Sequence, residues 1–491
     1  MTSFGCFDQV HPMYLRRFVV PSLLILPALA VLLTSGCATA ASAPAAAGSA
    51  PAAGWDREAE ILSHIHAPQF ADRSFPITDY GATPGADATA ALRQAIEACH
   101  AAGGGHVLVP DGIFLTGAIR LLSNVDLHLS AGATLRFVTD PAAYLPVVYT
   151  RWEGIECMNY APLISALDQE NIGVTGTGTL DGQASDETWW KWTIAQGAGP
   201  RPFAADAKAL GVMGETGVPV SQRIFGAGHH LRPNFIQPYR CQNVLIDGVT
   251  IVRSPMWELH PVLCTNFIAR NVIINTLGPN NDGCDPESCR YVLMDHVSFT
   301  TGDDCIAIKS GRNTDGRRIG VASEDFVIRN CAMNDGHAGV AIGSEVSGNC
   351  RNILVEDCKM DSPHLERALR LKSNAQRGGT IEDIYLRRIE VGHVSEALLT
   401  VDFLYEEGSH GAFPPTVRNI FFDHITVSGS PRVFFITGFA GATIDGIHIS
   451  HSVIHGVTQP EVVEQAGRID LDEVEIVPAA QPHSLSSRVI Q

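Results

Sequence analysis

A short strand-like motif recurs along the second half of the chain and limits the possible folds more than any other feature. Each copy holds three apolar residues, two polar residues and another apolar residue, as in Val244 to Val249. Further copies begin at Phe267, Val292, Phe326, Ile353, Ile384, Ile420 and Ile447. The offsets run from 23 residues (244 to 267) to 36 residues (384 to 420). A parallel β-helix produces such a pattern, because each coil stacks a strand on the one below while its loops vary in length.

The connections between the copies argue against the alternative, an open α/β domain in which strands alternate with long helices. Residues 300–313 and 374–383 are rich in small and polar residues and show no helical period. We therefore predict an all-β fold, a right-handed single-stranded parallel β-helix.

One helix is expected over residues 88–102, where Ala, Leu, Ile and Glu recur before three glycines stop it. It would cap the first coil, whose ladder edge is otherwise open to other chains. Strand-like runs at 107–110, 124–129 and 172–176 are expected to form the first coils, so that residues 75–475 make one domain. Residues 183–240, rich in Trp, Gly and Pro, interrupt the pattern and are predicted to be a loop insertion.

The first 37 residues have the pattern of an export signal. Arg16 and Arg17 precede an apolar run over residues 18–33, which ends at Thr34-Ser35-Gly36-Cys37. This ending resembles a bacterial lipoprotein box in which Cys37 becomes the lipidated N-terminus, and ordinary cleavage near Ala40 is the alternative. Residues 38–54 are expected to be a flexible Ala/Ser/Pro linker. We expect an exported protein, periplasmic or attached to the outer membrane as a lipoprotein, or else secreted.

The formal net charge of −18 excludes a nucleic-acid partner, because no basic field exists to collect phosphates. If the ligand is a polyanion, local cations must overcome this field at the site itself. Cys331 and Cys358 occupy equivalent places in two successive copies, which fits stacked thiols as well as a disulfide. No histidine lies at metal-ligand spacing from Cys284 and Cys289, so no metal site is predicted.

Polar side chains are densest in four segments of the middle coils, each about one coil from the next. The four segments are Asn280-Asn281-Asp282, Asp303-Asp304, Gly336-His337 and Arg370-Leu371-Lys372. In a β-helix they would stack on one face and form a single site. Glycoside hydrolysis needs one carboxylic acid and one carboxylate, and three aspartates are present. One of them should hold its proton to a higher pH, and His337 could help to keep that proton in place.

These segments resemble the motifs of the polygalacturonase family, glycoside hydrolase family 28. The family's marks are Asn-x-Asp-x-x-Asp, Gly/Gln-Asp-Asp, Gly-His-Gly and Arg-x-Lys, and they appear here in that order. The similarity extends over residues 75–427, including the stretches 79–82 and 127–129. The resemblance implies an inverting hydrolase of α-1,4-galacturonosidic bonds in pectin, monomeric and without a cofactor. The insertion would favour exo action if it closes one end of the cleft.

Carried over position by position, the resemblance makes Asp303 the general acid, and Asp282 with Asp304 the pair that activates water. An inverting pair normally stands ~6.5–9.5 Å apart, which leaves room for that water. Arg370 and Lys372 would bind the carboxylate of a uronic acid.

Three further positions belong to the implied substrate-binding set. They are Asn280, Tyr405 and Asp285, the last of which fits a structural turn nearly as well as a contact to sugar hydroxyls.

Two positions depart from the family pattern. Ala338 replaces a glycine in the third motif, where its methyl group would either crowd the cleft or be tolerated, and Asn281 replaces a threonine. Neither change removes a reacting group, so activity should survive.

Two groups of aromatic and histidine residues allow a structural and a functional interpretation. Trp257 and His260 lie in a stretch similar to one near the family's cleft. A structural role, with Trp257 packed in the core and His260 hydrogen-bonded to the backbone, is equally consistent with the sequence. Trp189, Trp190 and Trp192 could stack on sugar rings or pack the insertion against the β-helix.

Three alternative functions stay open on sequence alone. They are hydrolysis of another pectic backbone such as rhamnogalacturonan or xylogalacturonan, calcium-dependent pectate elimination, and non-catalytic carbohydrate binding. The expected partners are a pectic poly- or oligosaccharide and, through a lipidated Cys37, a membrane.

Overall fold

The computed structural model describes residues 54–195 and 199–479. The predicted export signal, the lipidation site Cys37 and residues 38–53 of the predicted linker lie outside this described part. Within it, no helix combines the length and the apolar character needed to cross a membrane.

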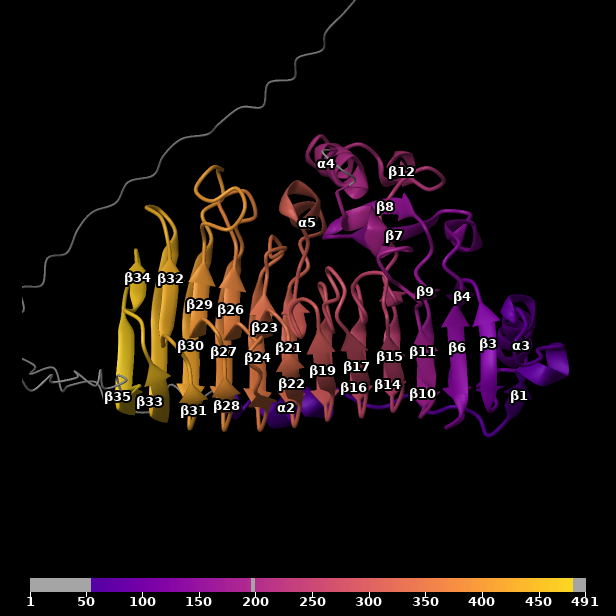
Figure 1. The fold of residues 1–491 in the computed structure, drawn as a ribbon, viewed down its shortest axis with the longest axis horizontal. Helices are drawn as coiled ribbons and strands as arrows, with labels where there is room; N and C mark the ends of the chain where they lie inside the picture. Colours follow the sequence, from indigo (N-terminus) through magenta and orange to yellow (C-terminus); the bar gives the residue numbers. More distant parts are fainter. Residues whose placement is uncertain (1–53, 196–198, 480–491) are drawn as a thin grey trace, which may run out of the picture. The chain divides into compact units, whose positions relative to one another are not determined.

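The recurring motif forms one continuous parallel sheet along the β-helix, which we call the first sheet (Figure 1). The predicted copies stack in register. Val244 pairs with Phe267 and Phe267 with Val292, and the same pairing continues up to Ile447 with no change of register. The strands of the first sheet are β1 (Ser74–Pro76), β2 (Gly105–Val109), β5 (Val125–Leu129), β10 (Glu170–Gly176), β14 (Gln242–Asp247), β16 (Thr265–Arg270), β18 (Arg290–Asp295), β21 (Ser323–Arg329), β24 (Cys350–Glu356), β27 (Thr380–Arg387), β30 (Thr416–Asp423), β33 (Thr443–Val457) and β35 (Ile469–Pro478). The predicted right-handed parallel β-helix is confirmed.

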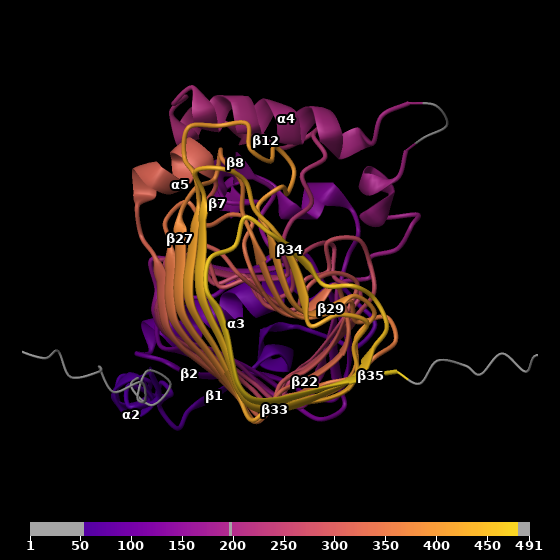
Figure 2. The same ribbon diagram turned by 90° about the vertical axis from the view of Figure 1, so that its left-hand side faces the viewer.

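Two more parallel sheets complete the coil, and the view along the stack shows the three walls around the core (Figure 2). The second sheet contains β3 (Gly112–Thr116), β6 (Ala133–Phe137), β11 (Thr179–Asp181), β15 (Thr250–Val252), β17 (Ile273–Thr276), β19 (Ser298–Thr301), β22 (Ala332–Asp335), β25 (Lys359–Met360), β28 (Glu390–His393) and β31 (Thr426–Gly429). The third sheet contains β4 (Ile119–Arg120), β9 (Ile164–Leu167), β13 (Ile236–Tyr239), β20 (Ile306–Ile308), β23 (Ala338–Ile342), β26 (Arg367–Lys372), β29 (Ala397–Asp402), β32 (Phe434–Thr437) and β34 (Val462–Glu464). Isolated bridges through Leu259 and Cys284 join β13 to β20.

Asparagines at one corner of the coil explain why strands of the first sheet begin where they do. Asn171, Asn243 and Asn266 have φ values of 53°, 56° and 58°, a left-handed conformation that asparagine tolerates well. Their amides also stack, because Asn243 donates to Asn171 at 2.9 Å and Asn266 donates to Asn243 at 2.7 Å. The ladder turns the chain and satisfies the amide groups between coils.

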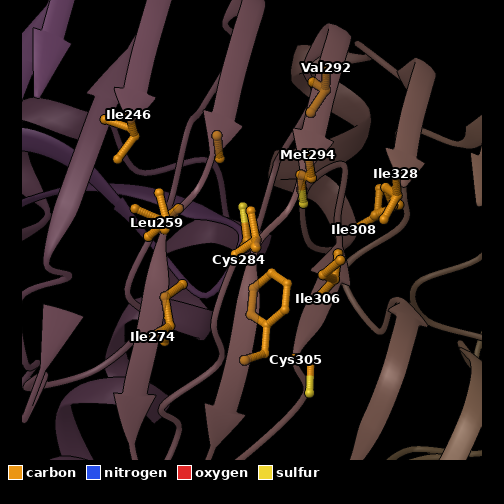
Figure 3. Close-up of a cluster of buried hydrophobic side chains, with 14 of the residues drawn as sticks. Ile246, Leu259, Ile274, Cys284, Val292, Met294, Cys305, Ile306, Ile308 and Ile328 are labelled. Atoms are coloured by element: carbon orange, nitrogen blue, oxygen red, sulfur yellow. The ribbon is translucent and has the colours of Figure 1, made fainter. Parts of the chain in front are cut away.

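The core is a column of apolar side chains that point inward from all three sheets. Figure 3 shows part of it, with Val292, Met294 and Ile328 from the first sheet facing Ile306 and Ile308 from the third. All five are fully buried. Alternation along each strand therefore sends every second side chain into the core and leaves the others to face outward.

The predicted capping helix is α3 (Thr89–Ala101), and its apolar face, with Leu92 and Ile96, packs on the N-terminal end of the core. At the other edge of the stack, β35 is lined by exposed acidic side chains, among them Asp472, Glu473 and Glu475. Charges at an open strand edge discourage pairing with other chains.

The insertion is shorter and more structured than predicted. Its predicted end at residue 240 is wrong, because Ile236–Tyr239 is strand β13 and pairs with β9. The segment before it contains α4 (Pro202–Glu215), the short helices η3 (Trp190–Thr193) and η4 (Val220–Gln222), and β12 (Ile224–Phe225). Its helical turns have no counterpart in the β-helix repeat.

A second excursion was not predicted at all. The antiparallel hairpin of β7 (Val148–Trp152) and β8 (Ile155–Asn159) lies with α4 and α5 (Asn313–Ile319) on the side of the third sheet (Figures 1 and 2). The third sheet is thus the face over which loops gather.

The segment before the first coil runs along the outside of the first sheet. It includes α2 (Glu58–Ser63), and Ile61 and Ile65 pack on Leu245, Ile268 and Val327. This strap covers apolar side chains that would otherwise face water.

The ten cysteines of the described residues are all buried free thiols. Cys331 and Cys358 are stacked thiols in neighbouring coils, which decides between the two possibilities that the sequence left open.

Replacement of Ile328 by Ala should destabilise the protein by about 2–5 kcal/mol, because it leaves a cavity in the close-packed column. Ile273→Ala, at a side chain 49% exposed, is the matched control and should change stability by less than about 0.5–1 kcal/mol. Thermal and denaturant unfolding of the three proteins measures both effects. Equal stability of the two variants would contradict the described core.

Candidate active site

The register of the third sheet brings the four predicted segments together. Cys284, Ile306, Val340 and Leu369 pair in succession across four coils. Asp282 and Asp304 each lie two residues before a member of this row, and Asp303 and His337 each lie three residues before one. Residues up to 90 positions apart (282 to 372) therefore meet at one edge of the sheet.

Three carboxyl groups form the centre of the site. One oxygen of each of Asp282, Asp303 and Asp304 lies within 4.8 Å of the others. Asp282 and Asp304 are buried, whereas the side chain of Asp303 is 20% exposed. Asp303 is therefore the carboxyl that an incoming molecule can reach most directly.

Asp303 forms an ion pair with His337, whose Nδ1 lies 2.9 Å from Oδ1 of the carboxylate. Burial alone would raise the pKa of Asp303, but the bond to His337 and the nearby Lys372 lower it to about 2. The same bond raises the pKa of His337. The pair is thus charged in the free site, and Asp303 is not the aspartate that holds its proton to a higher pH.

Asp282 and Asp304 differ in their electrostatic surroundings. Burial, together with the charges of Asp285 and Asp303, raises the pKa of Asp282 well above its usual range. Asp304 instead forms an ion pair with Lys372 at 2.7 Å, and Arg370 lies 3.9 Å away. Within the described residues, Oδ1 of both aspartates is buried without a hydrogen-bond partner. Two such oxygens can accept both hydrogens of one water molecule.

The closest carboxyl oxygens lie nearer together than the separation expected between the carboxyl groups of an inverting pair. The nearest oxygens of the carboxyl groups lie within 4.8 Å, closer than the expected ~6.5–9.5 Å. The short spacing follows from the stacking of neighbouring coils, since strands lie ~4.8 Å apart.

Asp285 does not reach the cleft. It is fully buried next to Asp282, and the only cation near it in the described residues is Lys309, at 3.4 Å. Neither of its carboxyl oxygens has a hydrogen-bond partner within the described residues, so both its predicted role in binding sugar hydroxyls and the structural alternative stay predictions.

Three of the five substrate-binding candidates line one pocket, which has a volume of about 110 Å³. Asn280, Lys372 and Tyr405 contribute to its wall together with Asp282 and Asp303. The Tyr405 ring lies 5.5 Å from the Lys372 ammonium and 5.6 Å from the Arg370 guanidinium, which orders both cations. A cationic corner thus lies beside the carboxyl cluster.

Five residues of the pocket wall were missed by sequence reasoning, namely Glu153, Lys309, Ser344, Glu345 and Glu406. Lys309 contacts Glu345 at 3.3 Å and lies 4.5 Å above the Trp257 ring. Its sequence signal was available, because it directly follows β20, the strand that comes after the Asp303-Asp304 motif. Glu153 is at the tip of the β7–β8 hairpin and had no such signal.

The two departures from the family pattern are structural. The Ala338 methyl group packs in a buried cluster with Ala307 and Ala341 rather than crowding the cleft. Asn281 is buried, and its amide donates to the carbonyl oxygens of Ser254 and Met256 at 3.1 and 3.0 Å.

His260 is a structural residue. It is fully buried, and its Nε2 lies 2.9 Å from Glu287. Trp257 is buried as well, although one edge of it lines the pocket. Trp189 and Trp192 pack against each other and on Tyr144 and Tyr160, and the Trp190 indole donates to the Ser254 carbonyl, so this cluster anchors the insertion.

The three carboxyl groups are close enough together to ligate a cation. Two of them already have partners of opposite charge, since Lys372 pairs with Asp304 and His337 with Asp303. A metal ion bound there would lie beside both of these cations.

Comparisons with known proteins agree on one family. The model of glycosyl hydrolases family 28 matches residues 224–466. The crystal structure of a hyperthermoactive exopolygalacturonase from Thermotoga maritima is 42% identical, with a TM-score of 0.83 over 86% of this chain and 96% of that one. A "Probable polygalacturonase" from Vitis vinifera is 28% identical over 72% of this chain and 67% of its own length. An endo-polygalacturonase from Pectobacterium parmentieri is 27% identical over 64% of this chain and 71% of its own length.

Asp303→Asn should lower the pKa of His337 towards ~6.5, because it removes the carboxylate that stabilises the imidazolium. NMR titration of the histidine ring protons measures this change. His451 lies on a coil distant from the site, and its neighbour Asp423 raises its pKa. It serves as the internal control, and its pKa should not change. An unchanged His337 pKa would show that the pair does not exist in solution.

Proposed function

The chain belongs to family 28 of the glycosyl hydrolases. From this premise we propose that it hydrolyses the α-1,4-galacturonosidic bonds of pectin, beginning at one end of the polysaccharide. The observation that carries this proposal is the carboxyl cluster of Asp282, Asp303 and Asp304 beside a cationic corner of the same pocket. The names of the relatives support the substrate class.

Asp303 is proposed as the general acid. It is the most accessible of the three carboxyl groups, and it shares one proton with His337. When a substrate displaces water from the pocket, the neutral form of this pair is favoured, which places the proton on Asp303 next to the leaving oxygen. The lowered pKa of Asp303 in the free site is therefore compatible with an acid role in the complex.

Asp282 and Asp304 are proposed to hold and activate the attacking water, and Asp304, the carboxylate paired with Lys372, is proposed to take its proton. Their unpartnered oxygens support this role, and so does the ion pair that restrains Asp304. We propose a single displacement with inversion, in which two carboxyl groups hold the water at one side of the cluster. Because this water is held at one side of the cluster, it does not need the usual wide gap between the acid and base carboxyl groups.

Arg370 and Lys372 are proposed to bind the substrate carboxylate. Both cations lie at the cleavage site, and a uronate there would compete with Asp304 for them. This local positive charge offsets the repulsion that a chain of net charge −18 exerts on a polyanion.

Exo action is supported by a wall at one end of the pocket. Arg151 of the hairpin pairs with Glu287 of the third sheet at 3.1 Å, and both side chains are fully buried. At the hairpin tip, Glu153 contacts Arg312 at 3.3 Å, and Arg312 contacts Glu406 at 3.2 Å. Three separate segments of the chain thus meet across the cleft.

The charge of this wall would also resist passage of a uronate chain. Glu153, Glu345 and Glu406 line the pocket. Burial raises the pKa of Glu153 to about 7, so near neutral pH it is only partly ionised, whereas, despite its burial, nearby cations lower the pKa of Glu345 and keep it charged. Carboxyl groups can accept hydrogen bonds from sugar hydroxyls but repel further uronates, so the pocket suits a terminal sugar.

The cellular site is a separate proposal. Export through the N-terminal signal, with lipidation of Cys37, is supported by the sequence pattern of residues 1–37 alone. An enzyme of this specificity held at the cell envelope would act on imported or neighbouring oligosaccharides.

Digestion of polygalacturonate followed by sizing of the products tests the proposed activity. We expect the monomer from the outset, and Asp303→Asn should lower the rate at least about 10²-fold because it removes the general acid. Asp357→Asn, at an exposed aspartate that follows β24 of the first sheet and pairs with Arg388, is the charge-matched control. A ladder of oligomers would contradict exo action, and an unsaturated product or full activity of Asp303→Asn would contradict hydrolysis by this site.

A further inference from the structure

A second pocket lies at the base of the β7–β8 hairpin, at the opposite end of that hairpin from the wall. Its volume is about 270 Å³. Polar and aromatic lining comes from Arg120, Tyr149, Ser165, Gln237 and Tyr239. Val148 and Met158, from the two hairpin strands, add apolar surface.

The Arg120 guanidinium is the charged group of this lining. It is exposed, and no carboxylate oxygen of the described residues lies within 4.0 Å of its nitrogens. Its strand β4 is paired with β9, so its backbone is fixed by the third sheet. A free cation on a chain of strong negative charge is a ready partner for an anion.

The tyrosine rings beside Arg120 are held rigidly. The Arg240 guanidinium lies 5.2 Å from the Tyr149 ring and 5.3 Å from the Tyr239 ring, and Asp168 fixes Arg240 through two hydrogen bonds of 2.6 and 2.8 Å. The Tyr239 hydroxyl donates to Glu156 at 2.5 Å. Ordered aromatic edges beside a forked cation suit a sugar that carries a carboxylate, because the ring packs on the apolar surface and the charge meets the arginine.

The hairpin separates this pocket from the active site. Val148 lines the second pocket and Glu153 lines the first, so the five residue steps between them span about 16 Å along the strand. Between them, Arg151 is buried against Glu287 and fills the groove over the third sheet. One continuous stretch of substrate cannot pass from one pocket to the other along this groove.

We propose that the second pocket is an accessory binding site for a uronic acid unit of the polymer, with Arg120 binding its carboxylate. The choice of ligand rests on the proposed function, since both the cation and the aromatic lining would serve the same substrate class. A site of this kind holds a second part of the pectin chain, or a neighbouring chain, while a chain end occupies the active site. It raises the local concentration of chain ends without taking part in the chemistry.

Affinity electrophoresis in gels containing polygalacturonate tests this site. The protein carries Asp303→Asn in all samples, so that the polymer is not degraded. Arg120→Ala should weaken retention about five-fold, the loss of roughly 1 kcal/mol expected for an exposed ion pair. Arg120→Lys, which keeps the charge, should retain most of the binding, and added salt should reduce retention by the parent protein.

Arg418→Ala is the control, because Arg418 is an exposed arginine on β30 that pairs with Glu382 in the first sheet, several coils away from the pocket. It should leave retention unchanged, and the thermal midpoints of all variants confirm that they are folded. Equal retention of Arg120→Ala and its parent, or an equal loss in Arg418→Ala, would overturn the accessory site. Hydrolysis by the wild-type protein is measured separately, so its absence would refute the proposed function without deciding the binding result.

Discussion

The parallel register of the third sheet is the constraint on which the site depends. Each coil places its strand directly on the one below, so residues separated by a loop of any length are brought to a fixed spacing. The apolar column inside the coil holds this register, because a slip by one residue would turn its inward side chains to the solvent. Asp282, Asp303 and Asp304 can crowd together only because the buried core keeps their strands in place.

Electrostatic balance is the second condition for such a crowded site. Three carboxyl groups within 4.8 Å repel one another, and the chain compensates with Lys372 on Asp304 and His337 on Asp303. Asp285, buried beside Asp282, is offset by Lys309. The cations that stabilise the free site are thus the same kind of group that an anionic substrate needs, and a uronate would replace one carboxylate partner by another.

The sequence predicted what depends on local repetition and on matched motifs, and it failed where distant segments fold over the β-helix. The copies from Val244 to Ile447 revealed the sheet and its register, because buried strands need alternating apolar residues. The hairpin that carries Glu153 lacks that repeat, and its contacts with Arg312 and Glu287 join residues more than 130 positions apart. The burial of Asp285 and the position of the shared proton on His337 depend on the complete environment of each group, which a motif does not contain.

The structure of the Asp303→Asn variant with a bound galacturonate oligomer would test the central claim most directly. The account predicts that the glycosidic oxygen lies within hydrogen-bond distance of residue 303, with the adjacent uronate on Arg370 and Lys372. It also predicts that the sugar chain ends at the wall formed by Glu153, Arg312 and Glu406. A sugar chain bound out of reach of residue 303, or one that continues past the hairpin, would contradict it.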